Sequence, residues 1–373
     1  MNSPSPAAVL TARRIAVSFV AAVSAVGVTG PLASAEPLGT SPGAGQHAPR
    51  APLAAHGIPF HDATVTRQKD GSFAVSWKAP GVRSVTVHAG GRAVARGGAE
   101  ATVTVRGLPA ADRQWFRLVP DRGDPLTLAD RSLHLEGAAN FRDAGGYRTA
   151  DGRWVKMGVL YRANSLNALT DADLAKLQRL GIRTDFDLRT PSERAKAPDR
   201  VPAGARYVVA NVLGGETSGE LPATPEKAVQ TMLDGYRAVV SQPAAGTAYR
   251  SLFGYAADSG AHGLAYHCES GKDRTGWAAA ALLTALGVDR DTVLRDYLAS
   301  NEYLAASNAA KLAGQPPEVA ARLKPVLDTR AEYLNAAFDE VSTRFGSFDA
   351  YLRDGLGLSE RDLERLRETL LTD

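Results

Sequence analysis

The sequence predicts an α/β fold preceded by a small all-β, sandwich-like domain. Three observations on the 373 residues support this prediction. Short alternating strands separated by turn residues fill residues 57–125, a spacing that is typical of a small antiparallel sandwich. From residue 130 to residue 373, predicted strands first alternate with helices and then give way to an almost wholly helical segment, as in an α/β domain. The length also suits two domains better than one.

The first 35 residues have the features of a secretory signal peptide. Arg13 and Arg14 precede an apolar stretch from Ile15 to Gly30, and small residues before Ala35 predict cleavage after that residue. The stretch is short and interrupted by glycines, which disfavours the alternative of a membrane anchor. The arginine pair leaves the general and twin-arginine export routes both open. We expect a secreted protein without stable membrane insertion, in which residues 36–56, rich in Pro, Gly, Ala and Ser, form a flexible linker.

The β-rich region contains five predicted strands divided by turns rich in Gly, Pro and Asp. These strands are Thr64–Arg67, Phe73–Trp77, Ser84–His88, Ala101–Val105 and Trp115–Val119. We expect Trp77 and Trp115 in the core of this domain, with a ligand platform as the alternative role.

The region from residue 130 begins with alternating elements. Thr170 is a good N-cap for a helix over 171–180, and Gly181 stands where such a helix would end. The other expected elements are strands at 158–162, 183–188 and 263–266, and helices at 226–241 and 277–286. Breaks in the helical remainder are expected at 314–317, 346 and 355–357.

The charge of the chain gives no support for nucleic-acid binding. The formal net charge is +3, and removal of the two arginines within residues 1–35 would leave +1. A nucleic-acid binder would show a basic excess instead. We therefore expect no nucleic-acid partner.

Cys268 is the only cysteine, so it cannot form an internal disulfide. The predicted order around it is buried strand, tight loop and helix. The amides of such a loop and the helix N-terminus form a concave anion site, whose field lowers a cysteine pKa from about 8.5 toward roughly 4–7. The alternative is an inert buried cysteine. The cluster of Arg, Lys, Asp and two glycines at the start of a helix disfavours that alternative.

The residues after Cys268 fit the hydrolysis of a phosphate ester, which needs a nucleophile and neutralised oxygens. Cys268 would attack phosphorus, and the planar fork of Arg274 would hold two phosphate oxygens. Asp273 would protonate the leaving oxygen and then activate water, or would form only a structural ion pair. This chemistry calls for no cofactor and no metal. The expected substrate-binding residues are Glu269, Ser270, Gly271, Lys272 and Thr275.

Three of these loop residues have individual expected roles. Gly271 relieves the crowding of a loop whose amides converge, because it has no Cβ. Thr275 can donate a hydrogen bond to the thiolate when the intermediate breaks down. Lys272 contacts an anionic substrate or is a solvated loop charge.

The segment Cys268–Arg274 resembles the C-x5-R loop of cysteine-dependent phosphatases. The longer segment from His267 to Gly276 resembles that of the bacterial atypical protein-tyrosine phosphatases, some of which also act on phosphoserine and phosphoinositides. Further segments resemble this family in the same order, and the resemblance extends from residue 132 to the C-terminus. These segments are Asn140–Tyr147, which departs at Ala144, then Leu160–Ala163 with Leu169 and Thr170, and Asp185–Arg194.

The resemblance implies a central, mostly parallel sheet flanked by helices, with a helical C-terminal part. It also implies Cys268 as nucleophile, Arg274 as phosphate clamp and Asp273 as general acid and base. Helices within 299–344 would be able to cover the site.

The general acid has alternatives, because the sequence lacks the Trp-Pro-Asp loop of classical tyrosine phosphatases. Asp199, which follows Pro198, is the nearest fragment, and its context favours Asp273 over it. Asp187 and Asp143 are further alternatives. The other expected role of the polar residues in these segments is a buried ion-pair network that supports the site. Its members would be Asp187, Arg189, Arg142 and Asp143, and His267 would be a further supporting residue.

The leading hypothesis is an exported cysteine-dependent phosphatase that hydrolyses phosphotyrosine, with phosphoserine and phosphothreonine as further substrates. A phosphoinositide or inositol-phosphate phosphatase is an alternative, because Lys272 adds a second cation to the loop. An alternative of another class is a non-catalytic binder of phosphorylated ligands. A sulfurtransferase is disfavoured, since Arg274 and Thr275 suit phosphate better. The expected partner is thus a phosphorylated protein or a phospholipid headgroup.

Overall fold

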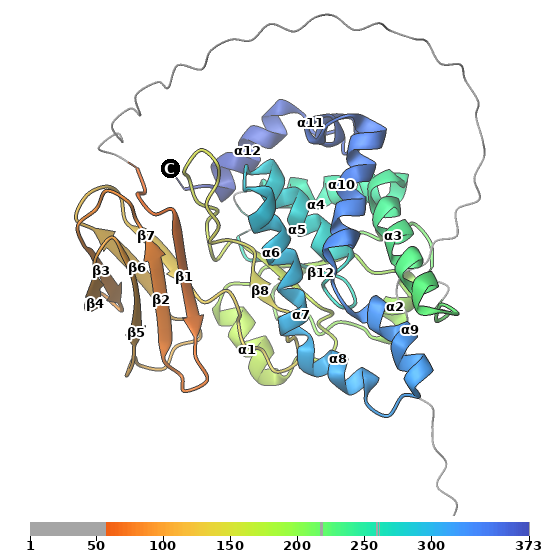
Figure 1. Cartoon of the computed structure of the whole chain (residues 1–373), viewed down its shortest axis with the longest axis horizontal. Helices are drawn as coiled ribbons and strands as arrows, with labels where there is room; N and C mark the ends of the chain where they lie inside the picture. Colours follow the sequence, from red (N-terminus) through yellow and green to blue (C-terminus); the bar gives the residue numbers. More distant parts are fainter. Residues whose placement is uncertain (1–56, 217–218, 259, 261, 373) are drawn as a thin grey trace, which may run out of the picture. The chain divides into compact units, whose positions relative to one another are not determined.

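The computed structural model describes residues 57–216, 219–258, 260 and 262–372 (Figure 1). The predicted signal peptide and linker lie outside these residues. The described chain forms two compact units. One contains residues 57–131 with 148–154, and the other contains residues 132–147 with 155–372. Within the described residues, no helix has the length and apolarity needed to cross a membrane.

The first unit contains two antiparallel sheets. The three-stranded sheet has the order β1-β2-β5, and the four-stranded sheet has the order β4-β3-β6-β7. Phe73 from one sheet and Phe116 from the other have ring centroids 5.2 Å apart, so a shared core lies between them. The strands are β1 (Asp62–Arg67), β2 (Phe73–Lys78), β3 (Val85–Ala89), β4 (Arg92–Gly97), β5 (Glu100–Val105), β6 (Trp115–Pro120) and β7 (Leu126–Ala129).

All five strands expected in this region overlap observed strands, and β4 and β7 were not expected. Strand β7 pairs with β6 and therefore extends the unit beyond residue 125. Trp77 is buried as expected, but Trp115 is 37% exposed. The core position expected for Trp115 is wrong, because its alternate neighbours Phe116 and Leu118 are the residues that face inward.

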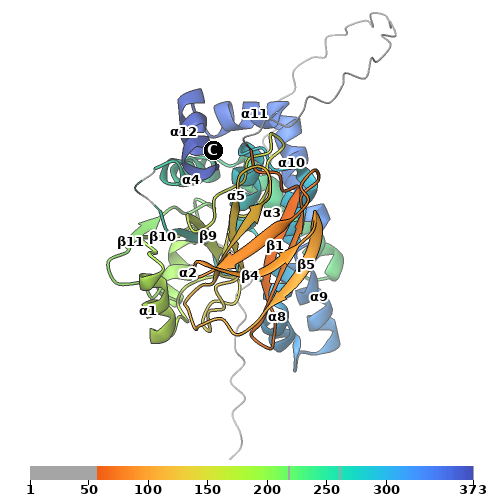
Figure 2. The same ribbon diagram turned by 90° about the vertical axis from the view of Figure 1, so that its left-hand side faces the viewer.

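The second unit contains a five-stranded sheet of order β11-β10-β12-β9-β8. Figure 2 labels its strands β11, β10 and β9. The four strands from β11 to β9 are parallel, and β8 is antiparallel at the edge. Asp187, His267 and Ala163 lie in register at the carboxyl ends of three neighbouring strands. The strands are β8 (Arg142–Asp143), β9 (Leu160–Ala163), β10 (Thr184–Asp187), β11 (Arg206–Val209) and β12 (Leu264–His267).

The two faces of this sheet have separate apolar cores, as expected of buried strands whose side chains alternate. Tyr161, Ala163 and Ala265 pack with Leu177 of α1. Leu160 and Tyr266 belong to the larger core, formed with α3, α4, α5 and the C-terminal helices.

The helices account for most of the second unit. Thr170 caps α1 in a reciprocal capping box, and Gly181 follows the helix with φ +77°, both as predicted. Helices α2 and α4 were not expected. The helical elements are α1 (Asp171–Arg179), α2 (Pro191–Lys196), α3 (Pro225–Ser241), α4 (Pro243–Ala256), α5 (Arg274–Ala285), α6 (Arg290–Leu298), α7 (Ser300–Tyr303), α8 (Ala305–Leu312), α9 (Pro317–Leu327), α10 (Ala331–Phe345), α11 (Phe348–Ala350), the π-helical turn Tyr351–Gly355 and α12 (Glu360–Leu370).

Candidate active site

Cys268 follows the last residue of β12, and α5 begins at Arg274, so the residues between them form the strand-to-helix loop. Cys268 is buried, with 2% of its surface exposed. The carboxyl ends of neighbouring parallel strands surround this position. Crevices at that edge are where open α/β sheets bind their ligands.

The carbonyl groups of the loop are held from outside it. The backbone amide of Ser165 donates to the Glu269 carbonyl at 3.0 Å. The Ser270 and Gly271 carbonyls accept from the side chains of Asn140 and Arg162, each at 3.0 Å. The backbone N–H groups of residues 269–273 donate no hydrogen bond within the described part of the chain. The N–H of a peptide points opposite to its carbonyl. Carbonyls held from outside the loop therefore turn the N–H groups toward its inside, where they form an anion-binding nest.

Gly271 is required by the backbone. Its φ is +68°, and a Cβ at this position would lie 2.2 Å from the Ala163 carbonyl oxygen. Only glycine allows this conformation together with so close an approach to β9. Gly271 therefore relieves crowding as expected, but the crowding is between the loop and the backbone of β9.

Glu193 orients the guanidinium of Arg274. Nη1 and Nη2 of Arg274 each donate to one carboxylate oxygen of Glu193 at 2.7 Å, and both side chains are buried. Burial opposes the charge, but the nearby Cys268 and Glu193 raise the pKa of Arg274. The Nε–H of Arg274 has no partner among the described residues. One edge of the planar fork is thus left for an oxyanion.

Asp273 contacts a cation and a phenol. Lys272 Nζ lies 2.9 and 3.0 Å from the two carboxylate oxygens of Asp273. Tyr236 donates to the same carboxylate at 2.8 Å, and its hydroxyl is 2.7 Å from that of Tyr297. The expected alternative of an ion pair is therefore what the structure contains. Lys272 is 3% exposed and is not a solvated loop charge.

The other carboxylates considered for the general acid are fixed in structural contacts. Asp199 accepts from the Leu166 amide at 2.7 Å and contacts Arg189. Asp187 accepts from Arg189, with Nη2 at 2.8 Å. Asp143 accepts from the amides of Gly145 and Gly158 at 2.7 Å. All three side chains are buried, and none of them lies in the loop between Cys268 and Arg274, where Asp273 stands.

The buried network expected around the site is divided into separate groups. Asp187 pairs with Arg189 behind the Cys268 end of the loop. Arg142 lies elsewhere, with Nε 3.4 Å from Asp296 and Nη2 3.2 Å from the Ser300 hydroxyl. The expectation of one network is wrong, because β12 and β9 stand between the two groups in the sheet.

A comparison with known families identifies the chain. Residues 133–372 match the model described as the tyrosine phosphatase family. The chain belongs to this family. Protein-tyrosine phosphatases are phosphoric monoester hydrolases, and this protein is therefore an enzyme of that class.

Two relatives illustrate the match. A protein of Cupriavidus necator, named as a candidate tyrosine-protein phosphatase, is 37% identical over 250 residues, covering 63% of this chain and 86% of its own. The triple specificity protein phosphatase PtpB of Mycobacterium tuberculosis is 33% identical over 277 residues, covering 64% of this chain and 98% of its own. Among solved structures, that of TpbA from P. aeruginosa is 16% identical with a TM-score of 0.26, covering 55% of this chain and 91% of that one.

The remaining loop residues of the phosphatase differ in their surroundings. Thr275 Oγ1 is buried without a hydrogen-bond partner among the described residues, so no bond to the thiol is present. Glu269 is half-buried, and burial followed by Glu193 raises its pKa above the ordinary value. Ser270 is half-buried and is held through its carbonyl by Asn140.

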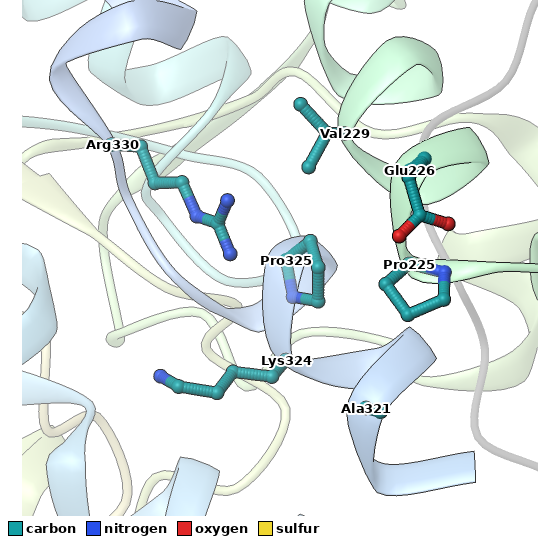
Figure 3. A pocket seen from close by; sticks show the side chains of 7 residues that line it. All are labelled: Pro225, Glu226, Val229, Ala321, Lys324, Pro325 and Arg330. Carbon is teal, nitrogen blue, oxygen red and sulfur yellow. The ribbon is translucent and has the colours of Figure 1, made fainter. Parts of the chain in front are cut away.

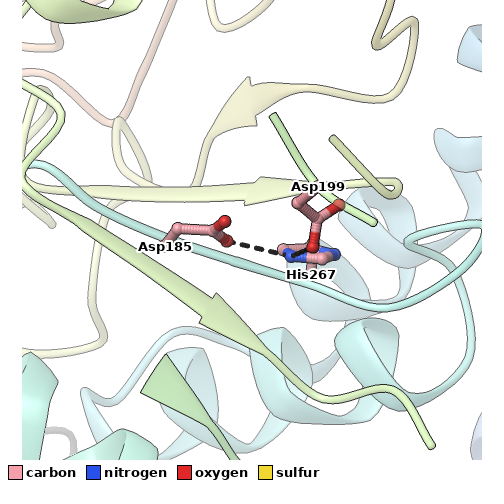
Figure 4. A group of neighbouring side chains, drawn as sticks. All are labelled: Asp185, Asp199 and His267. Atoms are coloured by element: carbon pink, nitrogen blue, oxygen red, sulfur yellow. Dashed lines mark ion pairs between the residues drawn. The ribbon is translucent and has the colours of Figure 1, made fainter. Parts of the chain in front are cut away.

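A buried cluster of two carboxylates and one imidazole includes His267, the residue before Cys268 (Figure 4). One ligand atom each from Asp185, Asp199 and His267 lies within 4.8 Å of the others. Carboxylates and imidazole are ligand types that divalent metals accept. Arg189 also contacts Asp199, so a cationic side chain already occupies part of this cluster.

A cavity of about 370 Å³ lies at the start of α3, against α9 and the residue before α10 (Figure 3). No residue of the Cys268 loop lines it. Its two cations are paired, since Lys324 is 2.9 Å from Asp328 and Arg330 is 3.4 Å from Glu332. Nothing in its lining therefore indicates a second anion site. The residues that line it are Pro225, Glu226, Val229, Ala321, Lys324, Pro325 and Arg330.

Several residues that interact with the loop were not predicted from the sequence. Glu193 had a detectable signal, because Thr190 and Glu193 form a capping box three residues apart with Pro191 between them. Tyr236 and Lys311 had no such signal. Lys311 of α8 is half-buried, and its charge acts on Glu269 and Lys272 of the loop. Helix α8 itself has no buried residue among those described.

Proposed function

We propose that this phosphatase hydrolyses phosphotyrosine, and also phosphoserine and phosphothreonine, through a thiophosphoryl-cysteine intermediate, and that it is exported from the cell. The observation that carries the proposal is the loop of inward amides around Cys268, closed by Arg274 in its fixed orientation. Its relative PtpB is named as a triple specificity phosphatase, which supports the wider substrate range. Non-catalytic binding is set aside, since the family is one of hydrolases.

The first chemical step transfers the phosphoryl group to sulfur. The Cys268 thiolate attacks phosphorus, the S–P bond forms, and the bond from phosphorus to the leaving oxygen breaks. The loop amides and the free edge of Arg274 neutralise the equatorial oxygens. Arg274 can do so without releasing Glu193, because its pairing uses only the terminal nitrogens.

Asp273 supplies the proton that the leaving oxygen takes up. In the described state its carboxylate faces Lys272 and Tyr236. A bound phosphate attracts Lys272 away from Asp273, which frees this carboxyl to carry a proton. In the second step Asp273 accepts a proton from water, water oxygen attacks phosphorus, and the S–P bond breaks to restore the thiolate.

Hydrolysis of an aryl phosphate by the purified protein tests the proposal. We expect Cys268→Ser to lose turnover by at least about a thousandfold, because the serine hydroxyl is a far weaker nucleophile at neutral pH. Asp273→Asn should lower kcat by about 10²–10⁴-fold and remove one limb of the pH profile. Normal turnover by Cys268→Ser would refute the thiolate mechanism.

Phosphoinositide hydrolysis remains a second candidate because of Lys311. Lys272 is paired with Asp273, so Lys311 is the further cation beside the loop that a polyanionic headgroup could use. Rates on matched phosphotyrosine and phosphoinositide substrates decide between them. If the phosphoinositide is the preferred substrate, Lys311→Gln lowers kcat/KM for the phosphoinositide more than for phosphotyrosine. Equal losses on both substrates exclude a headgroup-specific role of Lys311.

Export is supported by the sequence of residues 1–35 alone. N-terminal sequencing of the protein from culture medium should find Glu36 first. Retention of the whole chain inside the cell would refute this part of the proposal.

A further inference from the structure

The carboxylate of Asp273 accepts the last hydrogen bond of a chain that begins outside the loop. The Tyr236 hydroxyl donates to Asp273 Oδ1 at 2.8 Å and lies 2.7 Å from the Tyr297 hydroxyl. A phenol has one proton to donate, and Tyr236 uses it for the carboxylate, so Tyr297 is the donor between the two hydroxyls. The backbone N–H of Arg330 donates in turn to the Tyr297 oxygen. Every donor in the chain therefore points toward Asp273.

This direction distinguishes the two oxygens of Asp273. Lys272 does not distinguish them, because its Nζ lies 2.9 Å from one and 3.0 Å from the other. Tyr236 contacts Oδ1 and engages it as an acceptor. A carboxyl group with one oxygen engaged in this way still has the other oxygen to carry a proton. The chain of hydrogen bonds thus leaves Oδ2 for proton transfer.

Packing fixes the positions of both phenols. Tyr236 and Tyr297 are fully buried. The ring of Tyr236 packs edge-on against that of Tyr297, with centroids 6.0 Å apart, and stacks on that of Tyr333 at 5.8 Å. A Cβ at Gly276, in the first turn of α5, would lie 3.1 Å from Cδ2 of Tyr297, so the ring packs directly onto that turn. The two hydroxyls are therefore placed by helices and not by the loop.

The groups that face Asp273 are cations and neutral phenols. The cations favour the charged form of the carboxyl. Burial raises the pKa of each of the phenols above the ordinary value, so they carry no charge near neutral pH. From the elements packed around Asp273 these groups are Lys272 of the loop, Arg274 of α5, Tyr236 of α3, Tyr249 of α4, Tyr297 of α6 and Tyr333 of α10.

We propose that Tyr236 and Tyr297 are positioning residues that hold Asp273 by Oδ1, so that Oδ2 gives a proton to the leaving oxygen. In the second step the same oxygen takes the proton from the attacking water. This inference rests on the proposed function, in which Asp273 is the general acid and base. Without the Tyr236 hydroxyl, the carboxyl loses both its orientation and a donor that favours its charged form.

The dependence of kcat/KM on the leaving group tests the inference, because only a poor leaving group needs the acid. Phenyl phosphate releases a weakly acidic phenol, whereas the phenol of 4-nitrophenyl phosphate is acidic enough to leave as an anion. We expect Tyr236→Phe to lower kcat/KM about tenfold for phenyl phosphate and less than about threefold for 4-nitrophenyl phosphate. Tyr297→Phe should show a smaller loss with the same selectivity, and it serves as the test if the Tyr236 variant does not fold.

The pH profile of kcat gives a second readout. Loss of a donor to the carboxylate favours its protonated form, so the limb that falls at high pH should move upward by about one pH unit in Tyr236→Phe. Adding Tyr236→Phe to Asp273→Asn should change kcat/KM for phenyl phosphate by less than about twofold, because the group that Tyr236 acts through is already lost. A full additional loss in the double variant contradicts the inference.

Tyr351→Phe is the matched control. Tyr351 is also buried, and its hydroxyl accepts from Trp277 Nε1 at 3.1 Å. This variant should leave the ratio of the two kcat/KM values unchanged. A Tyr236→Phe protein with a lower melting temperature, equal losses on both substrates and an unmoved limb would make Tyr236 a structural residue only. If the unmodified protein hydrolyses neither substrate, the proposed function fails and the inference with it, whereas normal hydrolysis with an unchanged ratio in Tyr236→Phe overturns the inference alone.

Discussion

Two buried charge clusters support opposite ends of the phosphate loop, and their compositions are opposite. The acidic cluster behind Cys268 contains Asp185, Asp187, Asp199, Arg189 and His267. The basic cluster lies behind the Gly271 end of the loop, where Arg142 and Arg162 each contact one carboxylate oxygen of Asp296. The distance from Arg162 Nη1 to Asp296 Oδ2 is 2.5 Å. Arg162 then donates to the Gly271 carbonyl.

The difference teaches how each cluster is balanced. The basic cluster needs no proton, because guanidinium groups stay charged even where burial and Arg162 lower the pKa of Arg142. The acidic cluster places three carboxylates beside Arg189 and His267, and burial raises the pKa of Asp185 above its ordinary value. With two guanidinium groups and one carboxylate, the basic cluster has a positive excess, which lies beside the Gly271 end of the loop.

Removing the acid of the basic cluster should have the largest effect on stability. We expect Asp296→Asn to lower the free energy of unfolding by about 3–5 kcal/mol, because two buried guanidinium groups lose their counter-charge. Urea unfolding of the second unit measures this loss. The control is Glu100→Gln, which breaks an exposed pair with Lys78 and should cost less than about 1 kcal/mol. A loss below 1 kcal/mol for Asp296→Asn would show that other groups balance the arginines.

Glu193→Gln extends the comparison of the two clusters to Arg274. The charge of Arg274 is balanced by Glu193, a buried acid that belongs to neither cluster. Glutamine keeps the capping box of α2 but loses the charge and one of the two acceptors for Arg274. We expect kcat/KM for an aryl phosphate to fall about a hundredfold, which is about 2.7 kcal/mol, because Arg274 loses the carboxylate that orients it. Thr190→Ala is the control, since it should cost about 1 kcal/mol of stability and less than tenfold in kcat/KM. A fall of less than tenfold in kcat/KM for Glu193→Gln would make Glu193 a capping residue only.

The smallest effect is expected at the surface end of the acidic cluster. Tyr207 of β11 donates to Asp187 at 2.7 Å and is 42% exposed. Tyr207→Phe removes this hydrogen bond, but water can replace the donor, so about 1 kcal/mol of stability should be lost. The melting temperature measures this change. A loss as large as that of Asp296→Asn would mean that the acidic cluster depends on its surface contact.

The elements that the sequence predicted are those with a local cause. Thr170 and Gly181 mark the ends of α1 because capping needs only neighbouring residues. Strand β12 and the loop after it were likewise expected from an apolar run followed by small and polar residues. Helix α4 was missed because Gly246 and Gly254 weaken the helical pattern, and packing of its buried side chains in the larger core compensates for them.

The partners within the site were beyond the sequence because they come from distant segments. Asp273 meets Tyr236, which lies 37 positions earlier on α3, and Arg274 meets Glu193, which lies 81 positions earlier. No periodicity connects such residues. The four candidate acids looked alike in the sequence, and only their contacts distinguish them.

The sequence by itself predicted the roles of Cys268, the loop and Arg274, because these lie within seven consecutive residues whose order sets the local geometry. It also determined Gly271, which the backbone requires. Only the tertiary structure decided how the buried charges are divided between two clusters. Burial removes water, so the charge of each group depends on neighbours that the sheet brings together from separate strands.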